Sequence, residues 1–534
     1  MLSLLLALVP AEGLVVSVSP AADAVGRAIL ADGGNAVDAA VAVGFALAVS
    51  WPEAGNIGGG GFMLIRPAGA TSEPVVIDYR EKAPAAATKT LFAKGIATPY
   101  HTVGVPGSVA GLYLAHQRFG KLPWKRLVAP AIKLAEEGVA VDAALARSLN
   151  AGMVRGKAFA EFVRVFGRPG GGPWQVGDRL VQKDLAATLR RIAELGPDGF
   201  YKGETAKLLV QEMQAGKGLL TAEDLQAYRA IERKPIVGQY RGHMLYAPPP
   251  PSSGGITLML MLNMLEPMQL RKLGRHDPLT LHRLVEVMRR GYADRARHLG
   301  DGDFVKIPTE TLLSRDYARK RAVDINDERA TPSAEVAPEI KLRDEKPSTT
   351  HYSILDKDGM AVSTTTTIED SFGSRIVVRG AGFLLNNEMT DFNFAEGLTT
   401  RTGHIGTPAN LIAPGKRPLS SMTPLIVVKE GQPVLITGSP GGRTIINTVL
   451  QVVLNVLEFE LSPVEAVKAP RLHHQWFPDR VQAEAGLPVE GLTKRGHEVK
   501  RIKAQGDAHS IGREARSGKL VAAPDHRRAG RPAE

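Results

Sequence analysis

The stretch STTHYS, residues 348–353, separates two parts of the chain that differ in character. Residues 335–347 before it are polar and contain prolines, which is typical of an exposed loop. Residues 351–355 after it begin a β-type run, and a short turn leads into a second such run at 360–367. Thr349 therefore lies where an exposed loop meets a buried strand.

Thr349 allows two interpretations. In the first, it opens a strand, a position that suits the β-propensity of threonine. In the second, the bond between Ser348 and Thr349 is cut, and Thr349 becomes a new N-terminus whose hydroxyl is a nucleophile and whose own amine is the base. An α-amino group titrates near about 8, so a useful fraction is neutral at physiological pH. The local sequence does not decide between the two.

The composition is that of a globular protein with a large core. The chain has 534 residues, of which 44% are hydrophobic and 23% are charged. It has no cysteine, which excludes disulfides, thiolate metal sites and a cysteine nucleophile. The net charge of +11 is spread along the chain apart from a basic tail at 527–531. We therefore expect no nucleic-acid partner, and a preference for anionic small ligands.

Residues 2–9 form a short apolar run that resembles the end of a secretory leader. The run is too short to span a bilayer, and no lysine or arginine precedes it. We expect residues 1–12 to be a truncated signal segment, with a buried first strand as the alternative. The expected location is periplasmic or secreted, with the cytoplasm as the alternative. No other segment is long and apolar enough to predict a membrane span.

Before Thr349 the pattern is mainly helical. Periodicity and capping signals predict helices at 20–32, 36–49, 109–119, 124–137, 144–153, 183–195, 203–215, 256–265 and 279–299, the last with arginines and histidines on its outer face. Strands are predicted at 62–65, 75–80 and 236–246. The glycines at 58–61 indicate either positive φ angles or the close approach of another segment. Arg80, at a strand end, is either solvated or a clamp for a carboxylate.

After Thr349 the pattern is rich in strands. They are predicted at 351–355, 360–367, 375–378, 382–385, 424–429 and 433–437, and a helix is predicted at 443–459. The glycine-containing turn at 438–442 is either an ordinary tight turn or a site whose free N–H groups hold an anion. In the second case Gly441 and Gly442 could stabilise an oxyanion, and the hydroxyl of Thr367 could hold Thr349.

Other nucleophiles fit the sequence less well. A Ser-His-Asp hydrolase of the α/β type needs the motif G-x-S-x-G, which the chain lacks. His473 and His474 are adjacent and point apart, and there is no H-E-x-x-H motif, so we expect no metal at the active site. A threonine that uses its own amine as base needs no distant partner.

Several motifs together resemble the γ-glutamyltransferase family of N-terminal-nucleophile hydrolases. The blocks that carry the resemblance are 349–353, Gly359, Val362, Thr365, 367–369, 372–373, 33–40, 58–62, 248–255, 386–387, 418–422 and 438–442. They occur in the family's order over nearly the whole chain. Several long blocks in the right order are far more specific than any one motif.

The resemblance implies an α+β fold, a four-layer αββα sandwich formed jointly by two subunits cut from one precursor. The large subunit would comprise residues 13–348 and the small subunit residues 349–534, with cleavage between Ser348 and Thr349. The two would remain together as a heterodimer. The expected substrates are glutathione and other γ-glutamyl compounds, and the acceptors are water, amino acids or peptides. No cofactor is implied.

The resemblance also assigns site residues. Thr349 would be the nucleophile, Thr367 would assist it, and Gly441 and Gly442 would supply N–H groups to the oxyanion. Residues that would bind the α-carboxylate of the γ-glutamyl group are Arg80, Ser420 and Ser421. Those around its α-ammonium are Glu369, Glu388 and Asp391. One cation with hydroxyls at one end and acids at the other suits a zwitterion.

The chain departs from the family pattern at a few positions. Glu369 and Glu388 carry carboxylates where many members have amides, and Met360 replaces a small polar residue. The segment 396–410, which forms a lid in some members, lacks an aromatic residue. Two alternatives therefore stay open: a glutaryl-type (cephalosporin) acylase of the same fold, and a non-catalytic binding relative.

Overall fold

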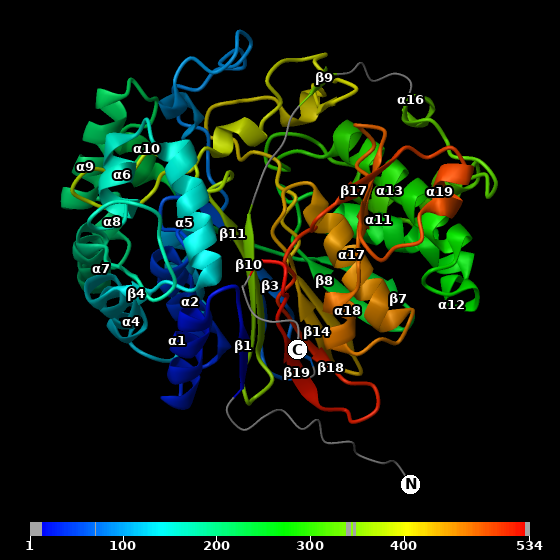
Figure 1. Cartoon of the computed structure of the whole chain (residues 1–534), viewed down its shortest axis with the longest axis horizontal. Helices are drawn as coiled ribbons and strands as arrows, with labels where there is room; N and C mark the ends of the chain where they lie inside the picture. Colours follow the sequence, from blue (N-terminus) through cyan, green and yellow to red (C-terminus); the bar gives the residue numbers. More distant parts are fainter. Residues whose placement is uncertain (1–12, 70, 338–342, 345–348, 529–534) are drawn as a thin grey trace.

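The computed structural model describes residues 13–69, 71–337, 343–344 and 349–528, and its centre consists of two β-sheets that lie face to face between layers of helices (Figure 1). Both sheets have six strands, and every pair of neighbouring strands is antiparallel. In spatial order the first contains β1 (Leu14–Val16), β10 (Thr350–Leu355), β11 (Ala361–Thr367), β2 (Gly60–Arg66), β3 (Val75–Asp78) and β6 (Ile231–Arg233). The second contains β19 (Leu520–Ala523), β18 (Ser510–Arg513), β14 (Gln432–Thr437), β13 (Leu425–Lys429), β8 (His243–Ala247) and β7 (Ile236–Tyr240).

Helices cover the outer face of each sheet, which gives the predicted four layers. On the first sheet lie α1 (Pro20–Ala31), α2 (Ala36–Ser50), α3 (Ser108–Phe119), α4 (Trp124–Glu137), α5 (Ala143–Gly156), α6 (Ala160–Phe166), α7 (Lys183–Leu195), α8 (Asp198–Tyr201), α9 (Gly203–Ala215) and α10 (Ala222–Ala227). On the second lie α11 (Gly254–Leu265), α13 (Pro278–His298), α17 (Thr444–Leu457) and α18 (Pro463–Lys468). The helices predicted from periodicity are confirmed, most of them to within one or two residues at each end.

Shorter elements complete the described chain. The helices among them are α12 (Leu270–Leu273), α14 (Thr309–Leu313), α15 (Arg315–Ala322), α16 (Ser333–Val336) and α19 (Glu490–Lys494). The strands are β4 (Val139–Ala140), β5 (Arg179–Leu180), β9 (Arg343–Asp344), β12 (Gly403–His404), β15 (Leu472–His473), β16 (Val481–Glu484) and β17 (Val499–Ile502). Within the described ranges, no helix combines the length and the apolar character needed to cross a membrane.

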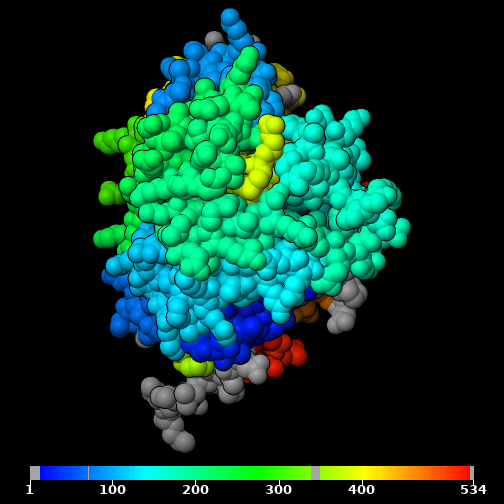
Figure 2. Space-filling view, turned by 90° about the vertical axis from the view of Figure 1, so that its left-hand side faces the viewer, coloured from blue at the N-terminus to red at the C-terminus, as the bar shows by residue number. Residues whose placement is uncertain are grey.

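The parts of the chain before and after Thr349 are interleaved rather than side by side. In the first sheet, β10 and β11 lie between β1 and β2, which come from the earlier part. On the face shown in Figure 2, a strip of the later part, coloured yellow, reaches the surface between helices of the earlier part. Contacts between the two parts include a hydrogen bond of 2.8 Å from Thr188 Oγ1 to the carbonyl of Ala381 and an ion pair between Arg379 and Glu212.

The buried helix α2 begins at the predicted cap. The side chain of Asn35 accepts hydrogen bonds from the backbone N–H groups of Val37 and Asp38, and the Asp38 carboxylate accepts one from the N–H of Asn35. Every residue of α2 is buried, as its all-round apolar character predicts. The hydroxyl of Tyr352 on β10 donates to the carbonyl of Ala40, so the helix lies directly against the strand that follows Thr349.

The glycines at 58–61 are explained by close approach and not by positive φ angles, since none of the four has one. A Cβ atom on Gly59 would lie 2.0 Å from the carbonyl oxygen of Thr367, and one on Gly58 would lie 2.1 Å from that of Leu384. A side chain at either position would therefore push the later part of the chain away. Gly59 in particular allows β2 to approach the end of β11.

Three predictions about elements were wrong. The single strand predicted at 236–246 is a hairpin, because Arg241 and Gly242 adopt positive φ angles and turn the chain between β7 and β8. The strands predicted at 375–378 and 382–385 are absent from the described chain, where only an isolated bridge joins Val377 to Leu384. Positive φ angles at Gly380 and Gly382 turn the chain there, so no ladder develops.

The predicted outer face of α13 was also wrong, because one of its histidines and three of its arginines are buried, namely His282, Arg289, Arg290 and Arg295. Glu286 forms ion pairs with both Arg289 and Arg290, one turn further along the helix. His282 Nδ1 lies 2.8 Å from His497 Nε2, and His282 Nε2 lies 2.8 Å from the carbonyl of Asn326. The two neutral imidazoles satisfy each other's hydrogen-bonding groups, which joins α13 to the C-terminal part of the chain.

This histidine pair predicts that acid destabilises the fold. Burial lowers the pKa of His282 and of His497, and the guanidinium of Arg289 lowers that of His497 further. Both imidazoles are therefore neutral in the fold but would protonate below about 6.5 in the unfolded chain, so their stabilising effect is lost as pH falls below that value. We expect the melting temperature to fall between pH 7 and pH 5.

The variant His497→Gln tests this cause. Glutamine keeps an N–H donor for His282 but cannot titrate, so its melting temperature should fall less over the same pH range. The difference in this fall between the wild type and the variant reports the effect of His497, because both proteins contain the same carboxylates that respond to pH. An identical fall in both proteins would contradict the prediction.

Candidate active site

Thr349 lies immediately before β10, and the strand register sets what it faces. Thr350 pairs with Thr366 across the antiparallel ladder, which brings Thr349 opposite Thr367. Their hydroxyl oxygens are 3.4 Å apart, and both residues are buried. The carbonyl of Thr349 accepts a hydrogen bond of 3.4 Å from Arg528 Nη1. The predicted pair of hydroxyls is therefore brought together, while Ser348 lies outside the described residues.

The end of β11 is held from several sides. The Thr367 hydroxyl accepts a hydrogen bond of 2.8 Å from the N–H of Glu369, and its carbonyl accepts one of 2.8 Å from Asn56 Nδ2. Asn56 Oδ1 in turn accepts from the N–H of Gly59 and from the hydroxyl of Ser108. This network fixes the position of the hydroxyl that faces Thr349.

The glycine turn lies between β14 and α17. Gly441 has φ +129° and Gly442 has φ +56°, both in the region that favours glycine. Within the described part of the chain, neither amide N–H donates a hydrogen bond, although both carbonyls accept one from the first turn of α17. Gly442 lines the same cavity as Thr349. The two N–H groups are therefore available to stabilise an anion at the strand-to-helix turn.

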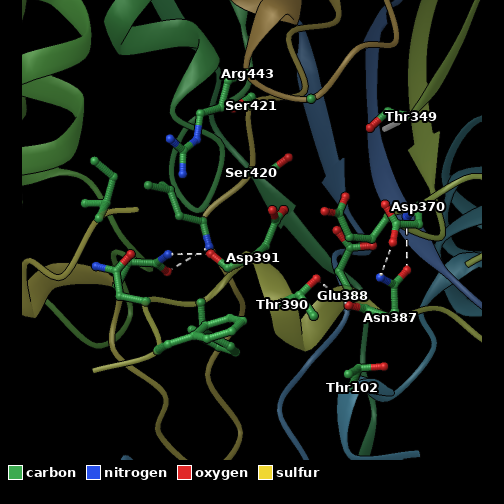
Figure 3. Close-up of a pocket in the computed structure, with 18 of the residues that line it drawn as sticks. Thr102, Thr349, Asp370, Asn387, Glu388, Thr390, Asp391, Ser420, Ser421 and Arg443 are labelled. Carbon is green, nitrogen blue, oxygen red and sulfur yellow. Dashed lines mark hydrogen bonds between the residues drawn. The ribbon is translucent and has the colours of Figure 1, made fainter. Parts of the chain in front are cut away.

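A cavity of about 450 Å³ opens beside Thr349 (Figure 3). The predicted site residues that line it are Arg80, Thr349, Glu369, Glu388, Asp391, Ser420, Ser421 and Gly442. Segment 396–410 contributes His404, Ile405, Thr407 and Asn410 to its wall. The structure therefore brings together residues from both parts of the chain that are more than 300 positions apart.

Arg80 follows β3, is buried and lines this cavity. It forms ion pairs with Glu388 and Asp391, while its Nε donates a hydrogen bond of 3.2 Å to the carbonyl of Pro418. Burial disfavours the charge of Arg80, but the neighbouring carboxylates outweigh burial and raise its pKa. Arg80 binds carboxylates, as one of the two interpretations from the sequence predicted. The carboxylates it contacts are side chains of the protein itself.

The acids form a cluster that suits a cation. Carboxyl oxygens of Glu369, Glu388 and Asp391 lie within 4.8 Å of one another. Burial raises the pKa of Glu369 and Glu388, and the charges of the other acids raise both further. A cation placed among them, whether a metal ion or an ammonium group, would lower the pKa of both acids. The three acids predicted to surround an ammonium thus share one wall of the cavity.

Glu369 also has an unusual backbone. Its φ angle is +74°, a conformation that glutamate adopts less readily than glycine or asparagine. Strained residues of this kind cluster at functional sites, where the surrounding structure holds them in place. The short segment that carries Thr367 therefore also sets the orientation of the Glu369 carboxylate.

Ser420 and Ser421 line the same cavity (Figure 3). The Ser420 carbonyl accepts hydrogen bonds from the N–H and the hydroxyl of Ser253, which fixes the segment. The Ser420 hydroxyl accepts from the N–H of Met422, at 3.0 Å. The Ser421 hydroxyl accepts from Arg295 Nη2, at 2.9 Å.

Sequence reasoning missed several residues of the cavity wall. These are Arg295 on α13, Arg443 before α17, and the pair Asp370 and Asn387, in which the Asn387 amide donates to Asp370 at 3.2 Å. The run of arginines along α13 looked like a solvated face. A stretch in which Arg289, Arg290 and Arg295 occupy three sides of one helix could have indicated burial, because such a helix has no single polar face.

Comparisons with known proteins show the family of this chain. The family model described as gamma-glutamyltranspeptidase matches residues 22–534. The glutathione hydrolase proenzyme of Escherichia coli (strain K12) is 46% identical over 511 residues, covering 94% of this chain and 88% of that protein. The glutathione hydrolase proenzyme of Bacillus subtilis (strain 168) is 39% identical over 506 residues, covering 90% and 84%.

Solved structures support the same grouping. A cephalosporin acylase from Bacillus halodurans has a TM-score of 0.84 at 28% identity and covers 97% of this chain and 94% of its own. A gamma-glutamyltranspeptidase from Helicobacter pylori has a TM-score of 0.59 at 42% identity and covers 61% of this chain and 95% of its own. The resemblance found in the sequence and the predicted N-terminal-nucleophile fold are confirmed, and the chain belongs to the gamma-glutamyltranspeptidase family.

Proposed function

We propose that this chain is a proenzyme that cleaves itself between Ser348 and Thr349 and then acts as a γ-glutamyltransferase and glutathione hydrolase. The observation that carries the proposal is the hydroxyl of Thr349, 3.4 Å from that of Thr367, in the wall of a cavity that offers both cations and carboxylates. The names of the Escherichia coli and Bacillus subtilis relatives support it.

The chemistry follows from these groups. After cleavage the free amine of Thr349 accepts the hydroxyl proton while the oxygen attacks the γ-carbonyl carbon. The N–H groups of Gly441 and Gly442 stabilise the oxyanion, and the Thr367 hydroxyl holds the nucleophile. The C–N bond then breaks, and the leaving amine takes the proton. Water, an amino acid or a peptide attacks the resulting ester, which releases the γ-glutamyl group and restores Thr349.

The cavity suits the zwitterionic end of a γ-glutamyl group. Glu369, Glu388 and Asp391 would bind the α-ammonium, whose charge would offset the repulsion among the three acids. Arg80, Ser420 and Ser421 would bind the α-carboxylate. Neither end requires a metal or a cofactor.

Cleavage would leave a large subunit, 13–348, and a small one, 349–534, as a heterodimer. The interleaved first sheet supports this, because β10 and β11 hydrogen-bond on both sides to strands of the large subunit. Separation would break both ladders at once. A periplasmic or secreted location is part of the proposal and is supported by the apolar run at 2–9.

One other activity has a specific observation in its favour. The Bacillus halodurans cephalosporin acylase has nearly the same fold over the whole chain. A glutaryl-type acylase would share the nucleophile but would not need a cluster of acids for an ammonium group. The presence of Glu369, Glu388 and Asp391 together therefore favours the γ-glutamyl substrate.

The test combines mass spectrometry with an amidase assay. Purified protein should yield a fragment that begins at Thr349 and should release p-nitroaniline from γ-glutamyl-p-nitroanilide. Equal turnover of the glutaryl anilide would favour the acylase. A single intact chain without p-nitroaniline release would mean a non-catalytic relative and would refute the proposal.

The variant Thr349→Ala should remain one chain and should be inactive, because the same hydroxyl serves cleavage and catalysis. Thr364→Val on β11 is the matched control, since it removes another buried hydroxyl from the same pair of strands. The control should be processed and active. Gel electrophoresis and the anilide assay measure both effects, and activity in the alanine variant would remove Thr349 from its role.

The variant Arg80→Lys should raise KM for γ-glutamyl-p-nitroanilide by tenfold or more while cleavage persists. Lysine keeps the charge but loses the forked geometry, and hydrogen bonds to charged groups contribute about 1.5–3 kcal/mol. Steady-state kinetics on the processed protein give the result. A KM within twofold of the wild type would show that Arg80 does not bind the substrate.

A further inference from the structure

The cavity beside Thr349 has a buried part and a mouth. Thr349, Arg80 and Glu388 lie in the buried part, and each is at most 5% exposed. The half-buried or exposed residues of the wall, which form the mouth, include Ile96, Ala97, Thr98, Pro99, Phe159 and Arg375. A γ-glutamyl group held in the buried part directs its amide nitrogen, and the group that this nitrogen carries, toward the mouth.

Arg375 brings a cation to this mouth. Its side chain is half-buried, and its Nε is buried without donating to any acceptor. Within the described part of the chain, no residue forms an ion pair or a hydrogen bond with its guanidinium. A guanidinium has five N–H donors in a fork that matches a carboxylate. The whole fork of Arg375 is therefore available to a ligand.

The acid nearest in sequence does not pair with Arg375. The charge of Arg375 acts on Asp370, where it opposes the rise in pKa that burial causes. The Asp370 carboxylate instead accepts a hydrogen bond of 3.2 Å from the Asn387 amide, and the N–H of Asp370 donates one of 3.0 Å to Asn387 Oδ1. Although Arg375 and Asp370 both belong to the described chain, they form no ion pair.

The backbone of Arg375 has a conformation that favours glycine. Its φ angle is +63°. Its neighbours fix this conformation, because the Ser374 hydroxyl donates to the carbonyl of Leu385 at 2.8 Å and accepts from the N–H of Ile376 at 3.2 Å. Residues held in this way cluster at sites that bind ligands. The strain and the unpaired fork thus occur in one residue at the mouth of the cavity.

We propose that Arg375 binds a carboxylate on the amine part of the substrate, the part that leaves with the amide nitrogen, and so selects γ-glutamyl peptides over simple γ-glutamyl amides. An acceptor amine attacks the carbon from which the first amine has left, so it occupies the same space. Arg375 therefore also favours acceptors that carry a carboxylate. This inference rests on the proposed function, and it leaves the α-carboxylate with Arg80, Ser420 and Ser421.

Two anilides that differ by one carboxylate test the inference. The leaving amine of γ-glutamyl-3-carboxy-4-nitroanilide carries a carboxylate, which that of γ-glutamyl-p-nitroanilide lacks. In Arg375→Gln we expect kcat/KM for the first to fall at least fivefold, mainly through KM, and that for the second to change less than twofold. Arg375→Lys, which keeps the charge without the fork, should recover part of the loss. Glycylglycine and glycylglycinamide give the same comparison for acceptors.

The variant Arg375→Gly separates binding from folding. Glycine adopts a positive φ angle without strain, which offsets the greater entropy of glycine in the unfolded chain. We therefore expect the melting temperature to stay close to that of the wild type, while the carboxylated anilide loses as much as in Arg375→Gln. Equal losses on both anilides would mean a structural role only and would overturn the inference.

Arg155→Gln is the matched control. Arg155, on α5, is exposed and also acts on Asp370, but it does not line the cavity. Its loss should leave the ratio of the two anilides unchanged. A change as large as that in Arg375→Gln would mean a long-range effect of charge on the cavity and would count against a bound carboxylate at Arg375.

Inhibition by L-glutamate separates the two ends of the substrate. L-Glutamate fills only the γ-glutamyl part of the cavity, so its inhibition constant should be the same in Arg375→Gln as in the wild type. A weaker inhibition would assign Arg375 to the α-carboxylate and would overturn the inference. If the wild type releases no nitroaniline from either anilide, the proposed function fails, and this inference with it. If the wild type is active and the ratio is unchanged in Arg375→Gln, only the present inference fails.

Discussion

The antiparallel pairing of β10 with β11 is the constraint on which the site depends. Because Thr350 pairs with Thr366, the residue before β10 must face the last residue of β11. A shift of one residue would turn every side chain of β10 to the other face of the sheet. The register is secured on the far side as well, where β11 pairs with β2 through glycines that admit no side chain. The position of the nucleophile is thus a property of the whole sheet rather than of a loop.

The balance of charges in the cavity is the second constraint on the site. Glu369 follows Thr367 by two residues, so the segment that positions the hydroxyl also carries one of the three clustered acids. The acids repel one another, and Arg80 offsets only part of their charge. A bound ammonium group would relieve this excess of negative charge.

Much of this architecture could be predicted from the sequence, because local rules fix it. Asn35 caps α2 as expected, and the periodicity of 124–137 and 183–195 gives helix bounds that the structure reproduces. What could not be predicted depends on contacts between distant segments. Arg80 and Asp391 are 311 positions apart, and the buried side chain of Arg295 contacts Ser253 and Ser421 from other segments. An isolated helix sequence with seven arginines and histidines is predicted to be exposed, whichever of them the fold buries.

The interleaving of the two parts explains how a chain could be cut beside its active site and still keep that site intact. A nucleophile that uses its own amine exists only after the peptide bond before it is broken. If the later part formed a separate domain, cutting would release it and disperse the acids, the glycine turn and Arg80. Here β10 and β11 are hydrogen-bonded on both sides to strands that precede Thr349, and Arg379 and Ala381 bind helices α9 and α7. The fold could therefore lose the peptide bond before Thr349 and still keep the geometry of the site.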